Sequence, residues 1–169
     1  MSSDIRIRKG LDIQLEGKAE AITKVAPLSQ VYGLRPAEFH RVIPKLIARE
    51  GATVKAGDPV FYDKRDERVL FPSPVSGTIT EIIRGERRKI LEIRITPDAT
   101  QSFQDFGKKE VNSLSPEQIK EHLLESGAWP LIKQRPYDVI ASVDSQPKAI
   151  FISACKTNPL APDYDYVLK

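Results

Sequence analysis

The chain has 169 residues, of which 40% are hydrophobic and 29% are charged. This composition is typical of a soluble globular protein, and it excludes a disordered or collagen-like chain. The net charge is only +3, from 26 basic and 23 acidic residues, and the basic residues form only short clusters mixed with acidic ones. Nucleic-acid binding usually needs a concentrated basic face, so we expect no nucleic-acid partner.

Membrane insertion and secretion are also excluded by the sequence pattern. No apolar run approaches the roughly 18 to 20 residues that a membrane-spanning helix needs. Residues 1–6 lack the apolar core of a secretory signal. The sequence therefore predicts a cytoplasmic protein with no transmembrane segment.

The residues that commonly hold metals and cofactors are scarce. Cys155 is the single cysteine, which excludes an internal disulfide, and no spacing resembles a zinc or iron–sulfur motif. The two histidines, His40 and His122, have no paired carboxylate or nucleophile at interpretable spacing, so we expect surface roles for them. Glycine-rich phosphate loops are missing as well. We expect no cofactor in this chain.

The first half of the chain has the pattern of short strands joined by tight turns. Apolar residues between positions 5 and 41 come in small groups broken by glycines and prolines, which favours strands over helices. Strand-like groups continue between residues 42 and 61. Gly51 and Gly57, which punctuate them, are expected to adopt positive φ.

A second set of strands follows a highly charged hairpin tip at residues 63–68. Its last strand, residues 90–95, alternates apolar and charged side chains, which indicates a half-buried strand, and a turn at Gly85 precedes it. The pattern predicts a compact β module between about residues 41 and 95. We interpret this module as a docking scaffold and not as an active site.

A helix with clear end signals is predicted after residue 114. Ser115 is its N-cap, Pro116 takes the first helical position, and Gln118 completes a capping box. Gly127 ends the helix. The apolar face is too narrow to stand alone in water, so the helix must pack on another element. That face consists of Ile119, Leu123 and Leu124.

Residues 149–154 form a continuous apolar run of the kind that fills the centre of a parallel sheet. A parallel neighbour needs a crossover of a dozen or more residues, and only 15 residues follow Ala154. We expect either that the chain is the front part of a longer protein or that another chain completes the sheet. The expected organisation is a β-rich domain at 1–97, a polar linker at 98–114, and at 115–169 a helix and the first strand of an incomplete α/β domain.

Four residues in the last part of the chain are candidate contacts for a quinone or a protein partner. Trp129 and Tyr137 flank a proline-rich bend, where aromatic side chains either seal a domain boundary or contact a planar ligand such as a quinone. Cys155 and Asn158 follow the predicted strand at its carboxyl end, where open α/β sheets place ligand sites. The alternative for Cys155 is an inert small residue, and for Asn158 a turn cap.

The β module resembles the biotinyl/lipoyl carrier family in its turn glycines, its charged tip and residues 74–79. This resemblance implies a barrel-sandwich hybrid, a flattened barrel of two interlocked strand sets that presents one modified lysine on a hairpin tip. Asp66 occupies the position of that lysine here, and Lys64 lies two positions away. The resemblance thus implies the scaffold without a covalent prosthetic group. The alternative is a carrier modified with biotin or a lipoyl group at Lys64; the other reading of the tip is a solvated charged turn.

Five segments in order resemble the NqrA family, which belongs to the bacterial sodium-translocating NADH:quinone oxidoreductases. These segments are residues 7–13, 61–64, 74–78, 135–138 and 149–161. The last segment is long and unusual, which makes the resemblance fairly specific.

This resemblance implies a peripheral subunit on the cytoplasmic side of the bacterial inner membrane. Its implied role is complex assembly, with a quinone interaction that no motif assigns to a residue. The partner subunits are expected to hold FAD, FMN, riboflavin and a 2Fe-2S cluster, with quinone as the substrate. A related alternative is the Rnf-type electron-transport subunit, which carries cysteine-rich motifs in its later part.

Overall fold

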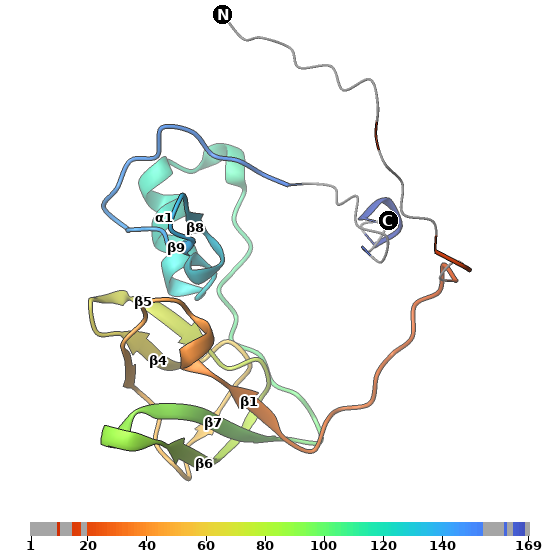
Figure 1. Ribbon diagram of the computed structural model, residues 1–169, viewed down its shortest axis with the longest axis vertical. Coiled ribbons are helices and arrows are strands. Elements are labelled where there is room, and N and C mark those ends of the chain that lie inside the picture. Colours follow the sequence, from red (N-terminus) through yellow and green to blue (C-terminus); the bar gives the residue numbers. More distant parts are fainter. Residues whose placement is uncertain (1–9, 11–14, 18–19, 154–160, 162–163, 168–169) are drawn as a thin grey trace, which may run out of the picture. The chain divides into compact units, whose positions relative to one another are not determined.

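A computed structural model of the chain describes residues 10, 15–17, 20–153, 161 and 164–167. Two compact units emerge from its contacts, one of which is Pro27–Gln146. The other unit combines Met1–Ala26 with Pro147–Lys169. Nearly all of the described secondary structure belongs to the first unit (Figure 1).

The β module consists of two antiparallel sheets. One sheet has the strand order β1 (Tyr32–Leu34), β7 (Ile90–Pro97), β6 (Gly77–Arg84) and β3 (Thr53–Val54). The other has the order β2 (Pro44–Leu46), β4 (Pro59–Asp63) and β5 (Asp66–Pro72). The mainly β module predicted from the sequence is therefore confirmed. Two short 3-10 turns, η1 (Pro36–Glu38) and η2 (Glu86–Arg88), lie beside these strands.

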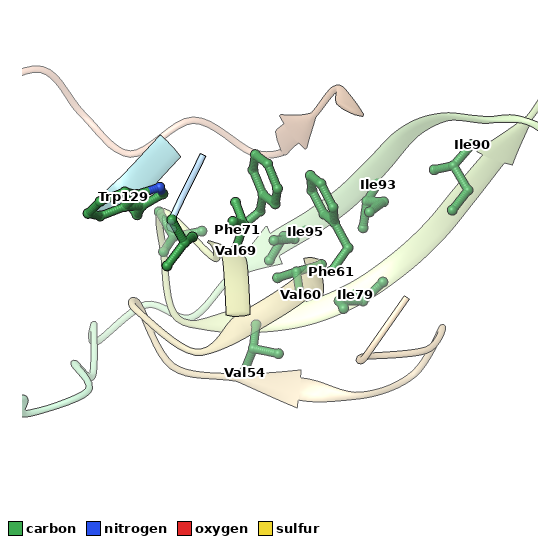
Figure 2. Packing of buried hydrophobic residues seen from close by; sticks show 12 residues of the cluster. Val54, Val60, Phe61, Val69, Phe71, Ile79, Ile90, Ile93, Ile95 and Trp129 are labelled. Carbon is green, nitrogen blue, oxygen red and sulfur yellow. The ribbon is translucent and has the colours of Figure 1, made fainter. Parts of the chain in front are cut away.

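The hydrophobic core lies between the two sheets. Phe61 of β4 and Ile79 of β6 have no exposed surface, and Figure 2 shows their side chains among those of both sheets. The rings of Phe61 and Phe71 stack with centroids 4.4 Å apart, and Phe39 meets Phe71 edge-on at 4.6 Å. Burial of each such side chain stabilises the fold by roughly 1.5–3 kcal/mol. Strand β5 turns Val69 and Phe71 inward by alternation, whereas β4 buries the consecutive residues Val60 and Phe61 beside a register shift.

Two turn glycines adopt the backbone conformation expected from the sequence. Gly51 has φ of 81° and Gly57 has φ of 100°, a region that other residues enter only with strain. The turn expected at Gly85 also forms, closed by a hydrogen bond from the Gly85 N–H to the Lys89 carbonyl at 2.8 Å. Gly85 itself has φ of −99°, and the left-handed positions of that turn are occupied by Arg87 and Arg88, with φ of 55° and 60°.

The start of the predicted linker is hydrogen-bonded to the β module. Ala56 donates its N–H to the carbonyl of Ser102 at 3.0 Å and accepts from Gln104 at 2.8 Å. The buried residue Ser76 accepts from the Ser102 N–H through its hydroxyl at 2.9 Å and donates its own N–H to Gln101 Oε1 at 2.8 Å. These bonds fasten residues 101–104 to the module. A short 3-10 turn, η3 (Val111–Ser113), then leads to the helix.

Helix α1 (Pro116–Glu125) begins and ends as the sequence predicts. The Ser115 side chain accepts from the Gln118 N–H, and the Gln118 side chain accepts from the Ser115 N–H, which completes the capping box. Gly127 follows the helix with φ of 67°. Leu123 and Leu124 pack against the core of the β module, so the narrow apolar face is covered.

The chain then forms a turn η4 (Trp129–Leu131) and a small hairpin of β8 (Lys133–Gln134) and β9 (Val139–Ile140). The indole of Trp129 belongs to the core cluster, and Figure 2 shows it at one end of that cluster with Ile90 at the other. The helix and the segment after it therefore extend the core of the β module.

The apolar run at residues 149–153 does not form the predicted strand. Ile150, Phe151 and Ile152 are 79%, 92% and 80% exposed, and Ala154 lies outside the described residues. A strand needs a hydrogen-bonded neighbour, and none of the strands in the described part of the chain pairs with residues 149–152. The same unit contains the short helix α2 (Tyr164–Val167). Within the described ranges, no helix combines the length and apolar character needed to cross a membrane.

Candidate functional site

The candidate site is the junction between the β4–β5 hairpin and residues 129–144, called here the hairpin junction. Both α1 and η4 contact β5. Trp129 is 8% exposed, and its Nε1–H donates to the Ala141 carbonyl at 2.8 Å. Val143 is 2% exposed and joins the same cluster. The junction is thus held by apolar packing and one partly buried hydrogen bond.

The turn of the β4–β5 hairpin consists of Lys64 and Arg65. Strand β4 ends at Asp63 and β5 begins at Asp66, and these two residues pair across the hairpin. The expectation that Asp66 takes the place of the carrier lysine on the hairpin tip was therefore wrong, because Asp66 is the first residue of β5. The strand pairing is irregular between Tyr62 and Asp63. Such an irregularity is not visible in the sequence spacing, which is why the tip position was misplaced.

This turn is fastened to the chain segment before β2. The N–H of Lys64 donates to the carbonyl of Ile43 at 2.8 Å. Asp63 Oδ1 accepts from the N–H groups of Ile43 and Arg65 at 3.2 and 3.1 Å. The Lys64 side chain itself is exposed. The backbone of the tip is held in place while its lysine remains accessible.

Arg68 links β5 to the loop after β9. Its Nε and Nη2 donate to the two oxygens of Asp66 at 2.8 and 2.7 Å, and its Nη1 and Nη2 donate to those of Asp144 at 2.9 and 2.7 Å. Such two-pronged pairs are the strongest form of exposed ion pair. Hydrogen bonds from Arg68 hold the pKa of Asp66 and of Asp144 below the usual value of 3.8. The same bonds raise the pKa of Arg68.

A pocket of about 340 Å³ lies at the hairpin junction. Its walls combine apolar side chains such as Val42 and Val69 with charged groups that include Arg41 and Asp144. Arg41 has φ of 67°, a strained value for an arginine that is typical of functional or tightly constrained positions. The pocket suits a small group with an apolar body, and the described residues contain no cluster of His, Cys, Asp and Glu that could hold a metal ion.

A second pocket, of about 490 Å³, lies along the edge of β1 and β7 and is charged. Its Glu92 accepts from Arg35 at 3.3 Å and from Arg94 at 3.0 Å, and Arg94 also donates to Glu81 at 2.8 Å. Hydrogen bonding from Arg94 lowers the pKa of Glu92. The arginines of this pocket already have carboxylate partners.

The four candidate contact residues have different environments. Trp129 is buried, whereas Tyr137 is 70% exposed in the β8–β9 hairpin. Cys155 and Asn158 lie outside the described residues. Tyr137 is therefore the aromatic candidate that a ligand can contact directly, and Trp129 supports the segment that carries it.

The histidines also differ from one another. His40 is exposed and borders the smaller pocket. His122 is half-buried in α1, and its Nδ1 is buried without a hydrogen-bond partner in the described part of the chain. The surface role expected for His122 is thus wrong, because its side chain is half-buried and its Nδ1 is buried.

Two family models match the chain in sequence order. The model of the NqrA N-terminal barrel-sandwich hybrid domain matches residues 5–98. The chain belongs to the NqrA family. The model of the NqrA second alpha/beta domain matches residues 114–169. The resemblance drawn from the sequence is confirmed, as is the expected order of a barrel-sandwich hybrid followed by an α/β domain.

Curated relatives of this NqrA-family chain are named as the A subunit of Na(+)-translocating NADH-quinone reductase. The protein of Haemophilus influenzae (strain PittGG) is 39% identical over 175 residues, covering 98% of this chain and 37% of the relative. That of Tolumonas auensis is 38% identical over 168 residues, covering 98% and 38%. That of a Marinomonas species is 34% identical over 165 residues, covering 96% and 37%. The chain spans little more than a third of the length of these relatives.

Proposed function

We propose that this chain is the N-terminal part of a peripheral subunit of a sodium-translocating NADH:quinone oxidoreductase. Within that subunit, the β module and the segment after it act as a docking scaffold for complex assembly. The observation that carries this proposal is the fixed hairpin junction, in which Arg68 joins the hairpin of a carrier-like fold to Asp144. The names of the relatives supply the setting.

A scaffold explains the geometry of the hairpin better than a carrier does. A carrier domain presents its modified lysine on a tip that visits separate active sites. Here the tip backbone is bonded to Ile43, and β5 is joined to the loop at Asp144 and covered by α1. A hairpin held on both sides is suited to a fixed interface. The exposed Lys64 is then a surface residue, and the carrier reading is not favoured.

The proposed setting is the cytoplasmic side of the bacterial inner membrane. In this proposal the flavins FAD, FMN and riboflavin and the 2Fe-2S cluster belong to partner subunits, and electrons pass from NADH to quinone within the complex. The domain limits proposed for this chain are 1–97 for the β domain, 98–114 for the connection, and 115–169 for the beginning of the α/β domain.

The quinone contact is proposed at the β8–β9 hairpin. Tyr137 is 70% exposed and Leu131 is 80% exposed, so this hairpin offers an aromatic face and an apolar side chain to a planar ring. The Arg135 guanidinium, 80% exposed, adds a hydrogen-bond donor for a quinone oxygen. Cys155 and Asn158 remain separate candidates for a quinone or partner contact.

Purification of the tagged full-length protein from membranes tests the assembly role. Wild-type protein is expected to bring the other subunits of the oxidoreductase with it. Arg68→Met is expected to weaken this association, because the hairpin junction loses its ionic link. A full-length protein that remains unassociated in cells making the whole complex would contradict the proposal.

Steady-state kinetics of the assembled complex test the quinone contact. Tyr137→Leu is expected to raise the KM for quinone several-fold, with little change in kcat or in the amount of assembled complex. Phe103→Leu is the matched control, because Phe103 is also exposed, at 72%, and lies outside this hairpin. An unchanged KM in the Tyr137 variant would exclude the contact.

A further inference from the structure

The turn between β6 and β7 accounts for the net positive charge of the chain. Residues 84–89, called here the basic turn, contain one acidic residue, Glu86. Removing this turn from the totals of 26 basic and 23 acidic residues leaves 22 of each sign. The net charge of +3 is thus located in six consecutive residues. The four cations are Arg84, Arg87, Arg88 and Lys89.

The cations of the basic turn differ from other arginines of the module in their contacts. Arg35, Arg68 and Arg94 each pair with two carboxylates. In the described part of the chain, no carboxylate lies within ion-pair distance of a cation of the basic turn. Among the described residues, their side chains form one hydrogen bond, from Arg84 Nη1 to the carbonyl of Arg88 at 3.2 Å. All four side chains are exposed.

The backbone of the basic turn is strained at two consecutive residues. Arg87 and Arg88 have φ of 55° and 60°, although left-handed conformations disfavour residues with a Cβ. Glycine would adopt these angles without strain, and the nearby Gly85 does not occupy either position. Backbone strain of this kind clusters at functional sites, which makes these two arginines candidates for binding.

An exposed apolar side chain lies next to these cations. Leu91 is 42% exposed and lies over Gly85, where an added Cβ would be 3.1 Å from Leu91 Cδ1. The turn joins β6 and β7, two strands of eight residues each, and it lies at the outer edge of the module (Figure 1). Neither of the two pockets is lined by residues of the basic turn. The surface is therefore a projecting turn and not a cleft.

We propose that the basic turn binds the phosphate groups of an anionic phospholipid bilayer. This inference rests on the proposed function, because that function places the chain beside a membrane. A projecting turn with several unpaired cations suits a broad anionic surface, where each basic residue adds to the attraction without a fixed geometry. Leu91 can enter the boundary between headgroups and acyl chains beside them. Binding to an acidic groove of a protein would instead need cations placed to form specific ion pairs.

Vesicle binding by the purified full-length protein tests this inference. Vesicles of phosphatidylglycerol mixed with phosphatidylcholine are expected to bind the protein, and pure phosphatidylcholine vesicles are not. The triple variant R87Q/R88Q/K89Q is expected to weaken binding on the order of a hundredfold, since each cation contributes roughly a fivefold factor. Added salt is expected to weaken wild-type binding.

A matched control removes the same charge elsewhere. K55Q/K108Q/K109Q also removes three positive charges, all from exposed lysines, and is expected to bind like wild type. Glu86→Gln is expected to bind about fivefold more tightly, and it decides the question if the triple variant does not fold. Equal losses in both triple variants, or no gain for Glu86→Gln, would overturn the inference.

Two further arms separate the bilayer from other anions. Inorganic phosphate at constant ionic strength is expected to displace little protein, and complete displacement would identify a free-phosphate site instead. Loss of co-purification with unchanged vesicle binding in R87Q/R88Q/K89Q would mean that the turn docks on a protein. Failure of the wild-type protein to co-purify would contradict the proposed function, whatever the vesicles show.

Discussion

The two long hairpins of the β module carry similar charged turns and use them differently. In the β4–β5 hairpin, Asp66, Arg68 and Asp144 form a closed set of ion pairs within the chain. In the β6–β7 hairpin, the cations of the basic turn have no carboxylate partner in the described residues. Charge content alone therefore does not assign a role to a turn. Arg68 and Asp66 in the β4–β5 hairpin are already neutralised within the chain, whereas the cations of the basic turn are available for the binding proposed above.

The hairpin junction is expected to depend most on Trp129. Trp129→Ala should lower the free energy of unfolding by about 3–5 kcal/mol, because the indole is part of the core and its Nε1–H bonds to Ala141. Urea denaturation measures this change. Trp129→Phe keeps an aromatic ring and should lose less. A loss below about 1 kcal/mol for the alanine variant would show that the junction does not rest on this residue.

The ionic link at Arg68 is expected to contribute less than the apolar packing. Arg68→Met should lower the free energy of unfolding, by less than Trp129→Ala, because the pairs with Asp66 and Asp144 are partly exposed. Arg88→Met is the matched control and should leave it nearly unchanged. A double-mutant cycle between Arg68→Met and Asp144→Asn measures the coupling. If Arg68→Met and Arg88→Met lowered the free energy of unfolding equally, the two hairpins would not differ in how their charges stabilise the fold.

The two hairpins should also differ in their response to acid. Arg68 lowers the pKa of Asp66 and Asp144 from the usual 3.8, so both carboxylates stay charged in the folded state after they would protonate in the unfolded chain. This stabilisation is present above pH 3.8 and is lost as the pH falls below it through the folded-state values. Denaturation at a series of acidic pH values measures the loss. Arg68→Met should flatten that dependence, whereas R87Q/R88Q/K89Q should leave it unchanged.

Local features of the fold could be predicted from the sequence, and distant pairings could not. Ser115, Gln118 and Gly127 act within one helix, and a capping box or a helix-ending glycine is visible in a few adjacent residues. The Arg68–Asp144 pair joins residues 76 positions apart, and nothing near Arg68 distinguishes it from other charges of its turn. The hairpin junction was therefore missed at the sequence level.

The apolar run at residues 149–153 shows a different limit. Its composition favours a buried strand, but a strand forms only beside a neighbour. In the structure Ile150, Phe151 and Ile152 are exposed, and no strand in the described ranges pairs with them. The basic turn shows a third limit, since the sequence points to Gly85 as its turn residue and the structure places the left-handed backbone at Arg87 and Arg88. A left-handed backbone at a residue other than glycine cannot be recognised from the sequence.

The smallest expected effect separates stability from binding at the basic turn. Arg88→Gly removes a Cβ at φ of 60°, so the relief of left-handed strain should exceed the added entropy of the unfolded chain. We expect a gain of about 0.5 kcal/mol in the free energy of unfolding, together with roughly fivefold weaker vesicle binding. Lys89→Gly is the control, because Lys89 has φ of −59° and glycine there should only destabilise. Urea denaturation and vesicle sedimentation of the same samples measure both effects. If Arg88→Gly makes the protein more stable and weakens vesicle binding, the strained backbone at Arg88 serves binding by the arginine side chain and does not serve the fold.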